Sequence, residues 1–384
     1  MKIAVAGLGY VGLSNAALLS RQHDVCAIAR HTPSRSVGEH GMRQRTIRNM
    51  EEFAAVSGIS RPTISKYFND PGSVRASTRA RIESALEQHE YRPNIFAMNQ
   101  NRRLTKNIGI VVPYLADPFF GEIARVIERR CIAEGYSPTL FSSHGDIELE
   151  VEILDALRSM KPAGVLLAPL GRASDKRAIE NFCKHVPTVL FDSNIDGMGE
   201  AFIGSDNYSF VSQTVEYLTR TGEPPLFFEM RNPANPNANK RRSAYLQMMD
   251  RLGLEPTVIK IDGEGWQFEE IGKQGAHALL DAGNLPTNTI LCSNDRLAIG
   301  FLSAAFERGL KVGRQPGCDL RLASHDDHPF ARFTCPALTT AAHDYDNVSD
   351  RSVETLFQLI ESGGHLPERQ ETLFAARLIM RDSA

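Results

Sequence analysis

The stretch that decides the fold of the N-terminal region is TIRNMEEFAAVSGISRPTISKYFNDPGSVRASTRARIESALEQHEYRPN, residues 46–94. Its apolar residues recur at three- and four-residue spacing in three short segments, which is the period of a helix. Ile47, Met50 and Ala54 share one face of the first predicted helix, and Gly58 interrupts the pattern after it. The segment therefore predicts two helices joined by a tight turn, followed by a third.

The second predicted helix has clear start signals. Ser60 is the expected N-cap, and Pro62 lies in the first turn, where a backbone N–H is not required. Ile64 and Phe68 form an apolar pair at i, i+4 spacing. After a turn, the third helix is expected to begin near Ser77 and to close a small apolar core.

The combined pattern resembles a known DNA-binding module. Residues 57–69 read S-G-I-S-x-x-T-I-S-x-x-F-N, and residues 91–94 read Y-R-P-N. These motifs resemble the N-terminal headpiece of the LacI/GalR family of transcription regulators. For any single helix, a small bundle with a solvated charged face is the alternative interpretation.

The resemblance assigns the headpiece to residues 42–93 and implies that its second helix lies in the major groove of operator DNA. Arg61, Pro62 and Lys66 occupy outward positions from which side chains reach base edges. Because one headpiece offers few contacts, a homodimer on a near-palindromic site is expected. The residues better placed to contact phosphates are Ser60, Thr63, Ser65 and Asn69.

The next segment, residues 94–106, corresponds to the family's hinge helix. In the family, paired hinge helices insert an apolar side chain into the minor groove. Gln100 stands where a leucine is usual, with Met98 as a possible substitute. Arg102 and Arg103 would contact phosphates in either case.

Charge supports a polyanionic partner for this region. The whole chain of 384 residues has a formal net charge of -3. Residues 42–106 nevertheless contain twelve Lys and Arg against six Asp and Glu, a net +6. A basic segment in an otherwise acidic chain is typical of a nucleic-acid-binding module.

The cysteines and the hydropathy argue against a metal-binding protein and a membrane-spanning protein. The six cysteines are widely separated, with no C-x-x-C and no histidine at ligand spacing, which predicts reduced thiols in a cytoplasmic protein and no metal site. No apolar run approaches the roughly 20 residues that span a bilayer. The cysteines are Cys26, Cys131, Cys183, Cys292, Cys318 and Cys335.

Residues 1–41 are predicted to be an N-terminal extension. A short strand precedes G-x-G-x-x-G at residues 7–12, the dinucleotide-binding fingerprint, and residues 1–28 resemble the N-terminus of a UDP-glucose dehydrogenase. That family has an acidic residue where this chain has Ala29 and Arg30, and no further Rossmann elements follow. We therefore expect a truncated, non-functional, disordered or loosely helical segment without a cofactor.

Residues 107–384 alternate short apolar runs with helix-length segments, which predicts an α/β fold with parallel sheets covered on both faces. IGIVVPYLADPFF and ILCSNDRLAIGFLSAAFERGLKVG resemble the periplasmic-binding-protein-like effector-binding and dimerisation domain of the same family. That resemblance implies two lobes, three crossings between them, and a ligand cleft. The expected strands are 108–112, 138–141, 164–168, 188–191, 226–228, 258–261 and 289–292.

Candidate ligand contacts follow strands, because a doubly wound sheet opens its crevice at the carboxyl ends of the strands. Carboxylates, amides and an arginine can hold vicinal hydroxyls, and aromatic rings can cover the face of a sugar. Other roles remain open: helix capping for Asn294 and Asp295, a surface ion pair for Arg241, and core packing for Trp266. The resemblance implies Asp117, Phe119, Asp192, Asp206, Asn207, Arg241, Trp266, Asn294, Asp295 and Asp326.

The sequence thus predicts a ligand-responsive DNA-binding regulator, more often a repressor in this family, of carbohydrate uptake or catabolism genes. A small sugar-like effector would set its affinity for the operator. Catalysis is not expected, because residues 107–384 contain no phosphate-binding loop, nucleophile elbow or H-E-x-x-H. The alternatives are an NAD-dependent UDP-sugar dehydrogenase-related protein and a sugar-binding protein without regulation.

Overall fold

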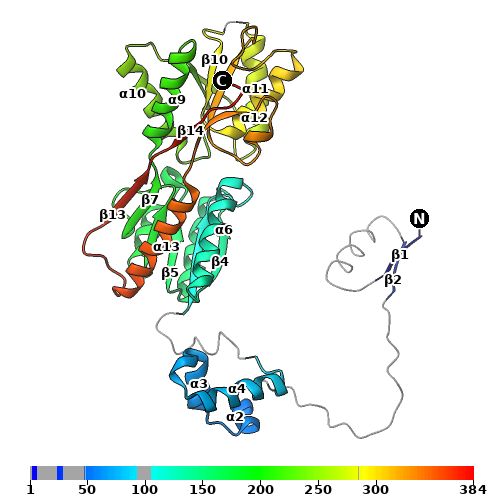
Figure 1. The fold of residues 1–384 in the computed structure, drawn as a ribbon, viewed down its shortest axis with the longest axis vertical. Helices are drawn as coiled ribbons and strands as arrows, with labels where there is room; N and C mark the ends of the chain where they lie inside the picture. The colour runs from blue at the N-terminus through cyan, green and yellow to red at the C-terminus, as the bar shows by residue number, and fades with distance from the viewer. Residues whose placement is uncertain (1, 7–23, 29–46, 48, 93–104, 284) are drawn as a thin grey trace. The chain divides into compact units, whose positions relative to one another are not determined.

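The computed structural model describes residues 2–6, 24–28, 47, 49–92, 105–283 and 285–384 (Figure 1). The chain divides into two compact units, residues 1–98 and 99–384, and each is described by itself. The hinge residues Met98, Gln100, Arg102 and Arg103 lie outside the described residues.

The first unit contains the expected three helices, α2 (Met50–Ser57), α3 (Arg61–Asn69) and α4 (Ala76–His89), with a 3₁₀ turn η1 (Pro71–Ser73). Phe53, Ile64 and Ile82 are fully buried and form its apolar centre. Gly58 ends α2 with φ of 64°, a left-handed conformation that glycine adopts without steric cost. This turn sends the chain directly into α3.

Two local expectations are wrong in detail. Ile47 precedes α2, because the Asn49 side chain accepts a hydrogen bond from Glu52 N and caps the helix there. Ser60 takes the N-cap position of α3, but its hydroxyl lies 2.8 Å from the Thr63 hydroxyl and forms no cap to a backbone N–H.

The N-terminal segment contains a parallel pair, β1 (Lys2–Ala6) with β2 (Asp24–Ile28). The expectation of a disordered or loosely helical extension is therefore wrong for these ten residues. The G-x-G-x-x-G motif at residues 7–12 lies outside the described residues.

The second unit is an α/β structure with two lobes, each built on a six-stranded sheet. The first lobe has strand order β13-β7-β6-β5-β3-β4, with every pair parallel. Its strands are β3 (Asn107–Val112), β4 (Ser137–Ser142), β5 (Gly164–Leu167), β6 (Thr188–Phe191), β7 (Ala201–Ser205) and β13 (Gln370–Phe374).

The sheet of the second lobe has the order β14-β12-β11-β10-β8-β9, with only the edge pair β12–β14 antiparallel. The chain passes between the lobes after β7, after β12 and after β13, which gives the three expected crossings. The strands are β8 (Leu226–Met230), β9 (Val258–Ile261), β10 (Thr289–Cys292), β11 (Arg321–Asp326), β12 (Thr339–Ala342) and β14 (Arg377–Ile379).

Helices cover both faces of each sheet (Figure 1). We call the front face the side covered by α6 (Pro118–Ala133) and α13 (Tyr345–Glu361) in the first lobe and by α11 (Phe268–Asp281) and α12 (Asp295–Glu307) in the second. The back face carries α7 (Ile147–Met160) and α8 (Lys176–Cys183), then α9 (Asn207–Thr221) and α10 (Ala238–Leu252). Within the described residues, no helix has the length and apolarity to cross a membrane.

Candidate DNA-reading surface and ligand cleft

Helix α3 presents a polar outer face and anchors its inner face through Ile64. Arg61, Pro62 and Lys66 are exposed on α3, and Ser60 is exposed just before it. Thr63 and Ser65 are half-buried. Asn69 ends α3, and its side chain lies outside the described residues.

The Arg61 guanidinium is available to a partner. Among the described residues it forms one ion pair, with Glu51 at 3.8 Å, and both side chains are exposed. Exposed pairs of this kind contribute about 0–1 kcal/mol, so an incoming phosphate or guanine can displace Glu51 at small cost. The geometry leaves three outward side chains of α3 free to contact a duplex.

Between the lobes, a buried network forms around Arg241. Only 2% of the Arg241 side chain is exposed. Its Nη2 donates to Asp326 Oδ1 at 2.5 Å, its Nη1 to Ser293 O at 2.7 Å, and its Nε to Asn207 Oδ1 at 3.3 Å. Arg241 is therefore not a surface ion pair, and it draws Asp326 and Asn207 together.

Asp326 has a second polar neighbour, His343. His343 Nε2 lies 3.0 Å from Asp326 Oδ1, and His343 Nδ1 lies 2.7 Å from Ser205 Oγ. Burial alone would raise the pKa of Asp326, but Arg241 and His343 hold it down, to about 2. The carboxylate is thus kept ionised, with Ser205 of the first lobe linked to it through His343.

Asp192 joins this network from the first lobe. It follows β6, is buried, and accepts a hydrogen bond from Asn237 Nδ2 at 3.0 Å. Asn237 in turn lies 3.5 Å from Asn207 Nδ2. Burial raises the pKa of Asp192 to about 7 despite nearby Lys240 and Arg241. The carboxyl therefore titrates near neutral pH and can act as a donor or as an acceptor.

A second bridge between the lobes lies on the front face. Arg296 Nη1 donates to Asp117 Oδ2 at 3.1 Å, and its Nε and Nη2 each donate to Glu269 at 2.7 Å. Asp117 also accepts from Phe119 N as the N-cap of α6. The two roles of Asp117 coexist, since its two carboxylate oxygens serve different partners.

The aromatic candidates are packed rather than open. Trp266 is 6% exposed and stacks on Tyr114 of the first lobe, with ring centroids 5.0 Å apart and planes 11° from parallel. Phe119 lies 4.7 Å from His343 and 5.6 Å from Tyr345, measured between ring centroids. Both rings lie at the boundary between the lobes. Trp266 is also part of the hydrophobic core.

Three further candidates have clear local partners. Asp206 caps α9 by accepting from Tyr208 N and Ser209 N, and Asn294 caps α12 by accepting from Leu297 N. Asp295 is fully buried and accepts from Thr340 Oγ1 and His328 N, each at 2.7 Å. Burial raises the pKa of Asp295 well above its ordinary value.

Four candidates, Asp192, Asn207, Arg241 and Asp326, are thus connected in one network, while Asp117 and Trp266 bridge the lobes elsewhere. The sequence did not single out Asn237, His343, Arg296 or Ser205. The asparagine-rich turn after β8 was an available signal for Asn237, because polar residues there follow a strand end. No three metal-ligating side chains cluster within the described residues.

The arrangement of an exposed helix-turn-helix and a two-lobed domain with charged groups between its sheets defines a DNA-binding regulator with a ligand domain. Comparisons with known proteins agree. Residues 49–94 match the model of bacterial regulatory proteins of the lacI family, and residues 215–384 match the periplasmic binding protein-like domain. The chain is a DNA-binding transcriptional regulator of the LacI/GalR family, and not an enzyme.

The relatives align with most of this chain and with nearly all of their own length. The ribose operon repressor of Escherichia coli K12 is 26% identical over 81% of this chain and 92% of its own. The repressor CytR of the same strain is 27% identical over 89% and 97%. A lac repressor dimer bound to operator and the anti-inducer ONPF superposes with a TM-score of 0.76 at 24% identity, covering 88% of this chain and 98% of that one.

The two matching family models do not cover the N-terminal segment. Neither family model reaches residues 1–28, and the resemblance of that segment to UDP-glucose dehydrogenase is not supported.

Proposed function

We propose that this regulator is a repressor of carbohydrate uptake or catabolism genes, acting in the cytoplasm as a homodimer on a near-palindromic operator. A sugar or sugar derivative would serve as the effector. The observation that carries the proposal is the buried network of Asp192, Asn237, Asn207, Arg241 and Asp326, which joins the strand ends of both lobes.

The chemistry of this network suits hydroxyl groups. Two carboxyl groups, two amides and a guanidinium offer donors and acceptors in fixed directions, as vicinal diols require. Phe119 adds an apolar face at the same boundary. The name of the ribose operon repressor, which aligns with 81% of this chain, points to the same class of compound. The proposed ligand contacts are Asp117, Phe119, Asp192, Asp206, Asn207, Arg241, Trp266, Asn294, Asp295 and Asp326.

Effector binding would change the affinity for DNA through a change in the arrangement of the two lobes. Ligand groups that replace cross-lobe contacts such as Asp192–Asn237 would favour one arrangement over another, and a ligand shifts an equilibrium only by its differential affinity for the two states. In a dimer that change would alter the spacing of paired headpieces (residues 42–93) and hinges (residues 94–106). The proposed DNA contacts are Ser60, Arg61, Pro62, Thr63, Ser65, Lys66, Asn69, Met98, Gln100, Arg102 and Arg103.

Residues 1–41 take no part in this proposal. A variant lacking them should bind DNA and ligand as the full chain does, since no described contact of the network involves them. Loss of both activities in that variant would contradict the assignment.

A thermal-shift screen tests the effector class. Monosaccharides, sugar acids and polyols are added to the full chain, because a ligand present at 100 times its Kd stabilises the folded state by about 2.7 kcal/mol. We expect at least one sugar or sugar derivative to raise Tm, and Asp192→Asn to reduce that shift. If no compound raises Tm, or if Asp192→Asn responds as the wild type does, the proposed site is wrong.

A further inference from the structure

A pocket of about 400 Å³ opens on the back face of the second unit, separate from the front-face contacts of Asp117 and Trp266. The first lobe contributes Arg172 and parts of β7 and β13, and the second lobe contributes the first turn of α9 and residues from the stretch 239–247 of α10. A smaller pocket of about 240 Å³ shares Arg172, Asn194 and Lys240 with it. We call the two together the back pocket.

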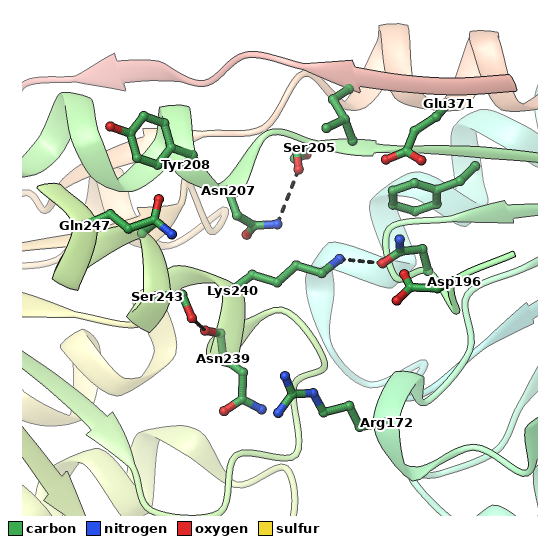
Figure 2. A pocket seen from close by; sticks show the side chains of 14 residues that line it. Arg172, Asp196, Ser205, Asn207, Tyr208, Asn239, Lys240, Ser243, Gln247 and Glu371 are labelled. Carbon is green, nitrogen blue, oxygen red and sulfur yellow. Dashed lines mark hydrogen bonds between the residues drawn. The ribbon is translucent and has the colours of Figure 1, made fainter.

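The back pocket has a cationic end. Arg172, Lys176 and Lys240 line its smaller part together with the carboxylate of Asp196, and Glu371 adds a second carboxylate in the larger part. Within the described part of the chain, none of these three cations forms an ion pair within 4.0 Å. Lys240 Nζ instead donates to Asn194 Oδ1 at 2.8 Å, across the boundary between the lobes. Figure 2 shows Lys240 extended across the pocket toward the side of Asp196, and Arg172 beside Asn239.

The opposite end of the pocket is neutral and polar. Tyr208, Ser243 and Gln247 line it from α9 and α10, and Phe202 provides an apolar wall. Figure 2 places Tyr208 and Gln247 on the side away from Arg172. Hydroxyl and amide groups beside an apolar surface suit a hydroxylated carbon skeleton.

The floor of the back pocket touches the buried network. Ser205 and Asn207 line the pocket, Ser205 is bonded to His343, and Asn207 accepts from Arg241. A molecule in the pocket would therefore contact both lobes and the outer members of the Arg241–Asp326 cluster. Such contacts couple occupancy of the pocket to the relative position of the lobes.

We propose that the back pocket binds a small hydroxylated molecule that carries a carboxylate or phosphate group. The anionic group lies between Arg172 and Lys240, and the hydroxylated part lies toward Tyr208 and Gln247. This site goes beyond the proposed effector cleft, because its charged residues Arg172, Lys176 and Lys240 are not among the proposed effector contacts, although Asn207 borders both sites. Its ligand acts as a second regulatory signal that fixes the lobes against each other.

Calorimetric titration of the full chain at constant ionic strength tests the proposal, with D-glucose 6-phosphate, D-gluconate and D-glucose as probes. We expect at least one anionic probe to bind, at least tenfold more tightly than D-glucose. Binding only by D-glucose 6-phosphate or only by D-gluconate identifies the anionic group. Failure of both anionic probes to bind, or equal binding of D-glucose, overturns the proposal.

Variants locate the binding. Arg172→Ala and Lys240→Ala should each weaken binding of the anionic probe at least tenfold, whereas Arg177→Ala, an exposed arginine of α8 that lines neither pocket, should leave it unchanged. Unaltered binding in Arg172→Ala and Lys240→Ala, or an equal loss in Arg177→Ala, overturns the assignment. Operator binding, measured in parallel, tests the proposed function independently.

Discussion

At the scale of single residues, the second unit contains buried charged side chains, and each of those in the Arg241 network has a partner that offsets the cost of burying its charge. Arg241, whose side chain is 2% exposed, forms an ion pair with Asp326, whose side chain is 16% exposed, and removing one partner of a buried pair costs about 3–5 kcal/mol. Asp326 also has φ of 117°, a conformation that side chains rarely adopt. Strained residues of this kind concentrate at functional sites, which supports the location of the proposed cleft.

His325 gives a residue-scale prediction about pH. It is fully buried, and neither ring nitrogen makes a hydrogen bond within the described residues. Burial, with Arg241 nearby, lowers the pKa of His325 to about 3. In the unfolded chain the pKa of this histidine returns to about 6.5. Between pH 6.5 and pH 3 the unfolded chain therefore binds a proton that the folded chain does not bind, and the free energy of unfolding decreases as the pH falls.

The variant His325→Leu should therefore gain stability over the wild type as pH falls. We expect the difference in free energy of unfolding to widen by up to about 1.4 kcal/mol per pH unit below pH 6.5. Urea unfolding of both proteins between pH 7 and pH 5 measures it, with the exposed His185→Leu as the control. A difference that stays constant over this range would show that His325 is not the group responsible.

At the scale of elements, the turn between α2 and α3 sets the geometry of the headpiece. An added Cβ at Gly58 meets nothing within 4 Å, so any penalty there comes from the backbone angle alone. Gly58→Val should destabilise the headpiece by roughly 1–2 kcal/mol, and Gly58→Asn by less, because asparagine tolerates the left-handed region. Hydrogen exchange of α2 and α3 amides in the full chain reports both, and equal effects of Val and Asn would contradict this explanation.

Some strands of the second unit could be predicted from the sequence and others could not. The apolar strands β3, β5, β6 and β10 were predictable, because strands buried on both faces carry continuous apolar side chains. β11, Arg321–Asp326, was missed because its residues Arg321, Ser324, His325 and Asp326 are polar although mostly buried. Their burial depends on neighbouring strands, which local patterns do not contain.

The same reason limits prediction of the site. Side chains after strand ends could be named individually, but their partners come from distant parts of the chain. Asp326 meets Arg241 and His343, and Asp117 meets Arg296 179 residues further along. Three-dimensional proximity, and not spacing in sequence, selects Arg296 and His343.

At the scale of the whole molecule, Trp266 offers an intrinsic reporter on the lobes of the second unit. It is the only tryptophan in the chain, and its partner Tyr114 belongs to the other lobe. Tyr114→Ala should shift Trp266 emission to longer wavelength by admitting water, with a loss of about 0.5–1.5 kcal/mol of stacking. Tyr136→Ala, which removes a stack with Phe357 inside the first lobe, is the matched control. Identical emission of Tyr114→Ala and wild type would contradict the cross-lobe packing.

In this regulator of the LacI/GalR family, we expect α3 to be the element that reads operator DNA. The most direct test is affinity selection of fragmented genomic DNA by the full chain, followed by sequencing. We predict that the wild type enriches a near-palindromic motif and that Arg61→Ala or Lys66→Ala loses it, since a bidentate arginine–guanine contact is worth about 1–3 kcal/mol. Arg81→Ala, an exposed arginine of α4, should retain the motif. A wild type that enriches no motif, or an Arg61→Ala/Lys66→Ala double variant that enriches the same one, would contradict the account.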